Sequence, residues 1–296
     1  MTLQLGILLA LLCAFVTNLA FFYKHRGACE VPPVCVRHPL RTARSLLRSG
    51  WFALGLVIAV GAWILHVGAM AMAPLSVVQV VLAGGVVMIG IMAERIFGFK
   101  VGRRQWIGLA LTAAGLVALA VTVPASHGAH SAFSVPAMIT FEAVLFGIGG
   151  LLIMGPQAGA RAEHHGTMLG AAAGILFGVS DVSIKALTGI VGTHGVVGLV
   201  SPWFGVAAAA SVIAFYASAR GLQDGEAVPV IAVTGAAANI SAIAGGILVF
   251  GDPLPGDALG IVVQALGLVL VIVASAIAPA PLRSARDSSL GAAAAA

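Results

Sequence analysis

Charged residues are scarce in this chain: they make up 8% of its 296 residues, whereas 60% are hydrophobic. A soluble domain of this length usually carries roughly 25% charged residues. The chain therefore lacks the polar surface that a soluble particle needs, and we predict an all-helical integral membrane protein. Glycine, with 38 residues, is abundant, as is common in membrane helices that pack closely.

Other absences narrow the function. No P-loop pattern occurs, so we expect no ATPase motor within the chain. Three cysteines do not make a disulfide framework. The net charge of +5 does not indicate nucleic-acid binding, because the basic residues sit in a few short loops. Their placement follows the positive-inside rule of membrane proteins instead.

Nine apolar stretches are long enough for the roughly 20 residues that a spanning helix requires. Their expected bounds are 3–23, 51–72, 75–94, 104–123, 136–155, 167–189, 198–218, 227–249 and 257–279. With the N-terminus outside and the C-terminus inside, the inside segments are 24–50, 95–103, 156–166, 219–226 and the tail. Every basic residue except Lys185 then falls in or at the edge of an inside segment, which supports this orientation.

An internal repeat is visible in two of these stretches. "WIGLALTAAGLVALAV" (106–121) aligns without gaps with "ALGIVVQALGLVLVIV" (258–273), and this alignment matches Gly115 to Gly267. We predict one transmembrane domain over residues 1–279, with repeat one at 1–123, a linker helix at 136–155 and repeat two at 167–279. The odd linker helix inverts the second repeat, an architecture common in secondary transporters. Residues 280–296 are expected to be a disordered cytoplasmic tail.

Three stretches carry a resemblance to a known family: "AMAPLSVVQVVLAGGVVMIGIMAER" (71–95), "WIGLALTAAGLV" (106–117) and "GILFGVSDVSIKALTGIV" (174–191). They resemble the drug/metabolite transporter (DMT) superfamily and its EamA-like members. Within it, the pattern is most similar to the nine-helix NIPA-like, magnesium-transporter-type branch. "VVQVVLAGG" stands where that branch usually has a second proline and a glycine. The resemblance implies a transporter and leaves its substrate open.

Three ionisable residues lie well inside the expected spans: Glu142, Asp181 and Lys185. Such residues usually face the bundle interior or water. At about 1.5 Å per residue all three fall in the outer half of the membrane. Three further polar side chains share that level by the same estimate, namely His66, Gln79 and Gln264. We expect the substrate or ion site among these six residues and Asn239.

Several roles remain open for these residues. Asp181 and Lys185 are spaced i, i+4 and could form a structural ion pair. Lys185 could instead extend to the outer surface. In a functional role, Asp181 binds a proton or cation in alternation with substrate, and Lys185 tunes its pKa or meets an anionic group. Glu142 is either a second titrating site or a residue at the lipid interface.

The remaining polar residues have plainer alternatives. Asn18 and Asn239 would commonly make hydrogen bonds between helices, although Asn239 could also line a locally unwound segment. A hydrogen-bonded interior histidine is the commoner role for His66. The small face formed by Gly174 and Gly178 either packs tightly on a neighbour or leaves room for a ligand.

The first inside loop contains His25, Cys29, Cys35 and His38, two thiols and two imidazoles that could hold zinc. Their spacing is not that of a standard finger, so no metal site is assigned. The basic residues of this loop more readily contact anionic lipid headgroups. The sequence "RAEHHG" (161–166) lacks the H-E-x-x-H pattern of a zinc hydrolase and fits a solvated turn.

The sequence thus predicts a gradient-driven secondary transporter for a small metabolite or cation, working by alternating access, with no cofactor and no enzymatic activity. A magnesium or divalent-cation transporter is the first alternative, although Lys185 beside Asp181 counts against a cation. A lipid-modifying membrane enzyme is the second, with a candidate cluster at Glu163, His164 and His165. The expected partners are substrate and membrane lipids, and a homodimer is left open. The expected location is a bacterial inner membrane.

Overall fold

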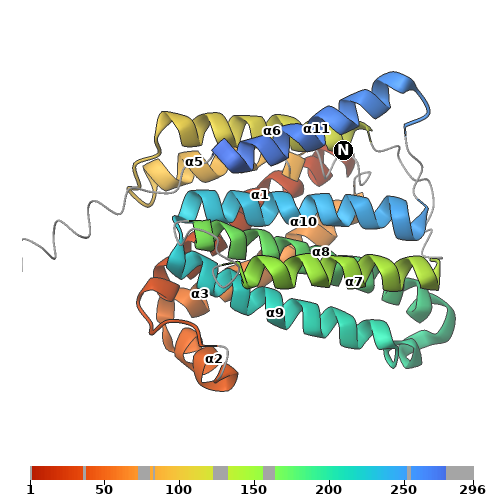
Figure 1. The fold of residues 1–296 in the computed structure, drawn as a ribbon, viewed down its shortest axis with the longest axis horizontal. Coiled ribbons are helices and arrows are strands. Elements are labelled where there is room, and N and C mark those ends of the chain that lie inside the picture. Colours follow the sequence, from red (N-terminus) through yellow and green to blue (C-terminus); the bar gives the residue numbers. More distant parts are fainter. Residues whose placement is uncertain are drawn as a thin grey trace, which may run out of the picture.

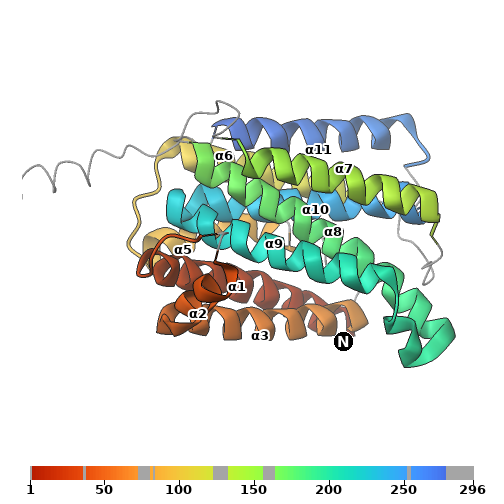
Figure 2. The same ribbon diagram turned by 60° about the horizontal axis from the view of Figure 1, so that its bottom comes forward.

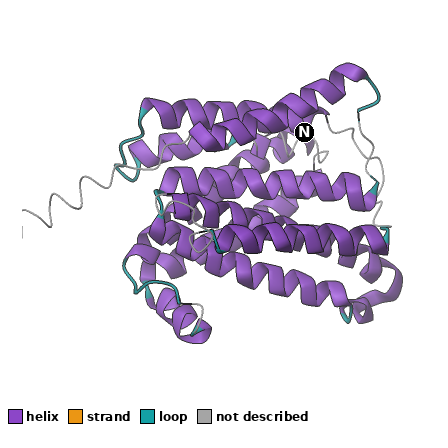
Figure 3. Cartoon of the chain, in the orientation of Figure 1, coloured by secondary structure: helices purple, strands orange, loops and turns teal. Residues whose placement is uncertain are grey.

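The computed structural model describes residues 2–35, 38–72, 81–82, 84–122, 133–155, 164–251 and 255–277. No strand occurs in these ranges, and nearly all of the described chain is helical (Figure 3). The helices are α1 (Thr2–Cys29), α2 (Pro39–Arg48), α3 (Gly50–Met72), α5 (Val86–Arg95), α6 (Arg103–Thr122), α7 (Val135–Ile153), α8 (His165–His194), α9 (Pro202–Asp224), α10 (Ala227–Phe250) and α11 (Ala258–Ile277), with a 3₁₀ turn η2 (Gly195–Leu199) between α8 and α9.

Local sequence signals account for several helix ends. Proline occupies the first turn of α2, α7 and α9, where its missing N–H would have no helical partner. The hydroxyl of Ser201 accepts a hydrogen bond from the backbone N–H of Trp203 and caps α9. At the C-terminal end of α10, Gly251 adopts φ +69°, a left-handed conformation that glycine reaches without strain.

Each expected span overlaps a helix of the structure. The third, 75–94, does so only through α5, because residues 73–80 and 83 lie outside the described ranges. In the part of the chain that is described, five helices are long and apolar enough to cross a membrane, namely α1, α7, α8, α9 and α10. A sixth is obtained if α2 and α3, which meet at 91°, count as one bent span. The chain is therefore an all-helical, multi-pass membrane protein.

The long helices lie side by side in one bundle (Figure 1). α1 packs on α3, α8 packs on α7, α9 and α10, and α6 packs on α11. The second view places α11 along one edge of the bundle and the α1–α3 pair along the opposite edge (Figure 2). Close approach depends on small residues: a Cβ atom added at Gly174 would clash with the backbone of Thr234, and one at Gly178 with the Cβ of Ser241. The small face of α8 therefore packs on α10, which confirms the first of its two predicted roles.

Most of the segments expected on the inside meet at one end of the bundle, which we call the basic end and define as residues 24–50, 95–105, 164–166 and 219–226. Bonds to residues 219–226 establish the grouping: His25 Nδ1 lies 2.8 Å from the carbonyl oxygen of Leu222, His165 Nδ1 lies 3.0 Å from Asp224, and Gln105 donates to Glu226. The basic loops thus share one side, as predicted. The tail lies outside the described residues.

A reciprocal contact joins α6 and α11. A Cβ atom added at Gly115 would lie 2.6 Å from the carbonyl oxygen of Gly267, and one added at Gly267 would lie 2.8 Å from the carbonyl oxygen of Gly115. The neighbours match as well: Gly115 faces Leu270 and Val271, and Gly267 faces Ala118 and Leu119. The two helices meet at the very glycines that the repeat alignment pairs.

Candidate functional site

Asp181 lies about 24 Å along α8 from His165, deep in an apolar span. Its side chain is exposed, and within the described chain its carboxylate makes no hydrogen bond or ion pair. Its direction follows from its neighbours. The hydroxyl of Ser180 lies 2.8 Å from that of Ser211 on α9, and Gly178 packs on Ser241 of α10. At about 100° per residue, Asp181 falls in the sector of α8 between those two faces.

Lys185 lies close to α10, one turn beyond Asp181. Its Nζ sits 4.2 Å from the centroid of the Phe250 ring, a cation–π contact. No ion pair joins Asp181 and Lys185, both of which are described. The predicted structural ion pair within α8 is therefore not formed. The i, i+4 spacing allows such a pair, but the ammonium group of Lys185 lies over the ring of Phe250.

Glu142 is buried, with 5% of its surface exposed, in the interface between α7 and α8. The hydroxyl of Ser183, which is fully buried, donates a 2.6 Å hydrogen bond to its Oε1. The alternative of a residue at the lipid interface is therefore wrong for Glu142. Sequence reasoning missed Ser183, because a serine in an apolar helix commonly satisfies its hydroxyl on its own backbone.

The other predicted site residues are dispersed. His66 on α3 and Gln264 on α11 are half-buried, and Gln79 lies outside the described residues. Asn239 donates from Nδ2 to the carbonyl oxygen of Gly235 at 3.0 Å, so this amide N–H bonds within α10 and not between helices. Among the described members of the predicted set, no hydrogen bond or ion pair joins any two.

The expected role of Asn18 is confirmed. Its Nδ2 donates a 3.0 Å hydrogen bond to the carbonyl oxygen of Gly85, just before α5, and the side chain is buried. Asn18 thereby connects α1 to the start of α5.

The four candidate zinc ligands do not assemble in this structure. Nδ1 of His25 is directed at the carbonyl oxygen of Leu222, and Sγ of Cys29 lies 3.8 Å from the same oxygen. Cys35 is exposed. Over the described ranges, no three His, Cys, Asp or Glu side chains come close enough together to hold a metal ion.

Several bonds between the N-terminal and C-terminal halves connect the helices at the basic end. Besides the His25 contact, Nε2 of Gln223 donates to the carbonyl oxygen of Ala28 at 2.8 Å, which ties α9 to α1. Nε2 of Gln105 on α6 donates to Oε2 of Glu226 at 2.5 Å, just before α10. Burial raises the pKa of Glu226 above its ordinary value, and the hydrogen bond from Gln105 partly offsets that rise. Sequence reasoning did not identify this network.

The turn that includes His164 and His165 has a structural partner. His165 and Arg220 both contact Oδ2 of Asp224, at 3.0 Å and 2.7 Å. Glu163 lies outside the described residues, so the predicted three-residue cluster of a lipid-modifying enzyme is described only in part. The partner of His165 comes from α9, which sequence spacing could not indicate.

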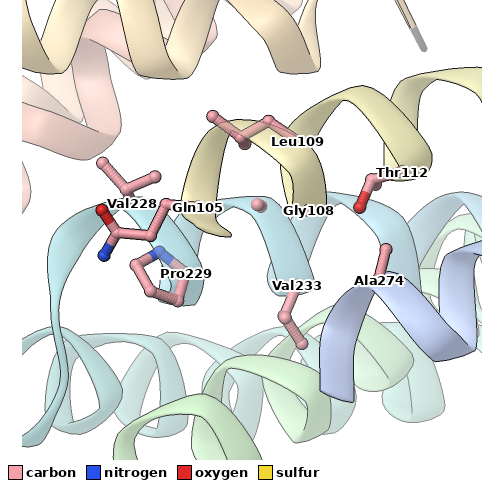
Figure 4. Close-up of a pocket in the computed structure, with 9 residues that line it drawn as sticks. Gln105, Gly108, Leu109, Thr112, Val228, Pro229, Val233 and Ala274 are labelled. Atoms are coloured by element: carbon pink, nitrogen blue, oxygen red, sulfur yellow. The ribbon is translucent and has the colours of Figure 1, made fainter. Parts of the chain in front are cut away.

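Two cavities lie near the basic end. The smaller one, between α6, α10 and α11, has a volume of about 10 Å³, at the lower limit for a single water molecule. Figure 4 shows its lining, which includes Gln105, Gly108, Thr112, Pro229, Val233 and Ala274. The larger one, of about 550 Å³, is lined mainly by aromatic rings of α1, α3 and the loop after α5. None of the predicted site residues lines either cavity.

Comparison with known proteins identifies a relative. The chain is 23% identical over 265 residues to a protein of Arabidopsis thaliana named "Probable magnesium transporter NIPA9", and the match covers 86% of this chain and 76% of that protein. No family model matches the chain, and no solved structure does. The similarity spans most of the helical bundle and supports a relationship to NIPA-like transporters.

Proposed function

We propose that this chain is a secondary transporter that moves a small cation or solute by alternating access, with Asp181 at its binding site. The position of Asp181 within an apolar span, where its carboxylate has no hydrogen-bond or ion-pair partner in the described chain, carries this proposal. A carboxylate at this depth is strongly disfavoured in lipid, so it is expected to face protein or water. Its sector of α8 lies between α9 and α10, and α1 of the first half packs on both of these helices. Asp181 would therefore border the space between the two halves.

The contact between Gly115 and Gly267 supports an inverted repeat. The alignment pairs each residue of α6 with an equivalent on α11, and the contact is symmetric under that pairing. Gly108 and Ala274 line the same small cavity, so α6 and α11 run antiparallel. An axis that exchanges two antiparallel helices at their crossing point is perpendicular to both. Such an axis lies in the membrane plane, as in inverted-repeat transporters.

Magnesium is the first substrate to test, because the Arabidopsis relative carries that name. The absence of an ion pair between Asp181 and Lys185 removes one argument against a cation. Mg²⁺ usually keeps several waters and binds proteins through one or two carboxylates. A single exposed aspartate in a wet space would suit that chemistry.

In this conformation, the proposed site at Asp181 would be reached from only one side of the membrane. The basic end is closed by bonds from α1 to α9 and from Gln105 to Glu226. With the basic end inside, as the positive-inside rule favours, this state would be closed to the inside. Asp181 lies beyond the closure, toward the opposite end. Transport would require these bonds to break.

The test is ion uptake into proteoliposomes that contain a Mg²⁺-sensitive dye. Wild type is compared with Asp181→Asn and Asp181→Glu. Asp257→Asn makes the same chemical change just before α11, where asparagine can still accept the hydrogen bond from the N–H of Gly260, and is the matched control. We expect Asp181→Asn to lose at least about tenfold in uptake rate, since a hydrogen bond to a charged group contributes about 1.5–3 kcal/mol and each 1.4 kcal/mol is about tenfold. The control should keep its rate. Thermal unfolding of each variant shows whether the fold survives.

Two results would count against the proposal in different ways. If Asp181→Asn transports as wild type does, the assignment of the site is wrong. If wild type moves no Mg²⁺, the magnesium assignment is wrong. The same vesicles are then screened with other divalent cations and small metabolites, and a saturable substrate that depends on Asp181 would retain the transporter and replace its substrate.

A further inference from the structure

The helix α2 departs from the rest of the bundle in direction and composition. It spans ten residues, "PLRTARSLLR", and meets α3 at 91°. If α3 crosses the membrane, α2 lies along the membrane surface near the basic end. In Figure 1, α2 projects at the lower left of the bundle. Three arginines in ten residues exclude a place in the hydrocarbon core.

The side chains of α2 divide into three sectors at about 100° per residue. Thr42 and Leu46 are buried against the protein. Leu40 and Leu47 form a second sector and are exposed by 84% and 49%. The third sector consists of exposed arginines, namely Arg41, Arg44 and Arg48. This is the pattern of an interfacial helix, with leucines toward the acyl chains and arginines at headgroup level.

Contacts with the bundle fix the orientation of these sectors. The hydroxyl of Tyr216 on α9 donates a 2.8 Å hydrogen bond to the carbonyl oxygen of Pro39. Thr42 Oγ1 donates to the carbonyl oxygen of Cys35 at 3.1 Å and accepts from its N–H at 3.3 Å. Leu46 is fully buried. The helix therefore cannot turn its leucines toward the protein without losing these contacts.

Two other cations of the basic end have acidic partners within the described chain, unlike the arginines of α2. Arg220 pairs with Asp224, and Arg26 lies 3.9 Å from Glu30. In the described part of the chain, no acid pairs with Arg41, Arg44 or Arg48. Three exposed guanidinium groups on one sector can therefore bind anions from outside the protein. Guanidinium groups bind phosphate well.

We propose that α2 is a binding site for anionic phospholipids, in which the three arginines hold headgroup phosphates while Leu40 and Leu47 insert among the acyl chains. This inference needs only that α3 crosses the membrane, and it does not depend on what is transported. A basic residue near an anionic membrane contributes roughly fivefold in affinity. Loss of all three arginines should therefore weaken binding about a hundredfold.

The experiment measures thermal unfolding of the full chain in mixed micelles as phosphatidylglycerol replaces phosphatidylcholine. Wild type is compared with Arg41→Gln/Arg44→Gln/Arg48→Gln. The matched control, Lys100→Gln/Arg103→Gln/Arg104→Gln, removes three exposed positive charges from the same end. We expect phosphatidylglycerol to raise the midpoint of wild type and of the control. The α2 variant should show no rise over the same range of lipid.

Additional variants and a phosphate control separate lipid binding from damage to the helix and from binding of free anions. The variant Arg41→Lys/Arg44→Lys/Arg48→Lys retains the charge and should keep most of the response, which separates lipid binding from damage to the helix. If the glutamine variant does not fold, the three single Arg→Gln variants should each require about fivefold more lipid. An equal response of the α2 variant and the control would overturn the proposal. So would an equal stabilisation of wild type by inorganic phosphate, because the occupant would then be a free anion.

Discussion

The crossing of α6 and α11 gives the sharpest test of the fold. In Gly115→Ala, the new Cβ would lie 2.6 Å from the carbonyl oxygen of Gly267, whereas ordinary contact begins at 3.4 Å. The helices must separate by about 0.8 Å to accept it, an overpacking that typically destabilises by about 1–3 kcal/mol. Alanine recovers up to about 1 kcal/mol through its higher helix propensity. We expect a net loss, with a fall in unfolding midpoint of about 2–8 °C.

The symmetry of the contact sharpens this prediction. Gly267→Ala should cause a similar loss, because its Cβ would lie 2.8 Å from the carbonyl oxygen of Gly115. One separation of the helices relieves both clashes, so the double variant should lose less than the sum of the two single losses. Thermal unfolding in one detergent measures all three variants.

Control substitutions define the refuting result. A Cβ at Gly61 or Gly147 would meet nothing within 4 Å. Alanine at either position should leave the midpoint unchanged or raise it. If Gly115→Ala behaves like these controls, α6 and α11 do not cross at this glycine. The pseudo-twofold argument for an inverted repeat would then have no basis.

Two further predictions concern Glu142, which is buried, and Glu226, which is half-buried. Ser183→Ala removes the hydrogen bond to Glu142 and should lower stability by about 1–3 kcal/mol, whereas Glu142→Gln keeps an acceptor and should lower it less. The control is Ser134→Ala, at an exposed serine without a side-chain capping bond. Equal thermal unfolding midpoints for the three variants would refute this prediction. For Glu226, the raised pKa means that stability falls as pH rises from about 4.5 toward the folded-state pKa. Glu226→Gln lacks that loss. Its thermal unfolding midpoint should therefore match that of wild type at pH 4 and exceed it increasingly above pH 5. A difference between the two midpoints that stays constant across pH would contradict a raised pKa of Glu226.

The sequence predicts the helices well because each span is a long apolar run between loops that contain charge or proline. The grouping of basic loops at one end follows from the same pattern, since basic residues are kept to one side of a membrane. The helix α2 could also have been found. Its proline at the start and its leucines and arginines at helical spacing are an amphipathic signal that a search for apolar runs overlooks.

Contacts between distant segments could not be predicted in the same way. Nothing in the local sequence of α8 distinguishes Ser183, which bonds Glu142, from Ser180, which faces α9. The i, i+4 spacing of Asp181 and Lys185 allows an ion pair. The pair is not formed between these two described residues, and the ammonium group of Lys185 instead contacts the ring of Phe250, 65 residues further along the chain. Depth in the membrane can be counted along a helix, but the direction of a side chain depends on how neighbouring helices pack.

Two kinds of contact join the halves, and they suggest which contacts would stay in place and which would break during the proposed transport cycle. At Gly115 and Gly267 the backbones of α6 and α11 approach closely, because neither glycine has a side chain that would hold the helices apart. This crossing would serve as the fixed point of the motion. The basic end is instead held by side-chain bonds, from Gln223 to a backbone carbonyl and from Gln105 to Glu226. Such bonds can be exchanged for water at small net cost. Opening would expose the carboxylate of Glu226 and lower its pKa toward the ordinary value, so protonation of Glu226 would favour the closed basic end.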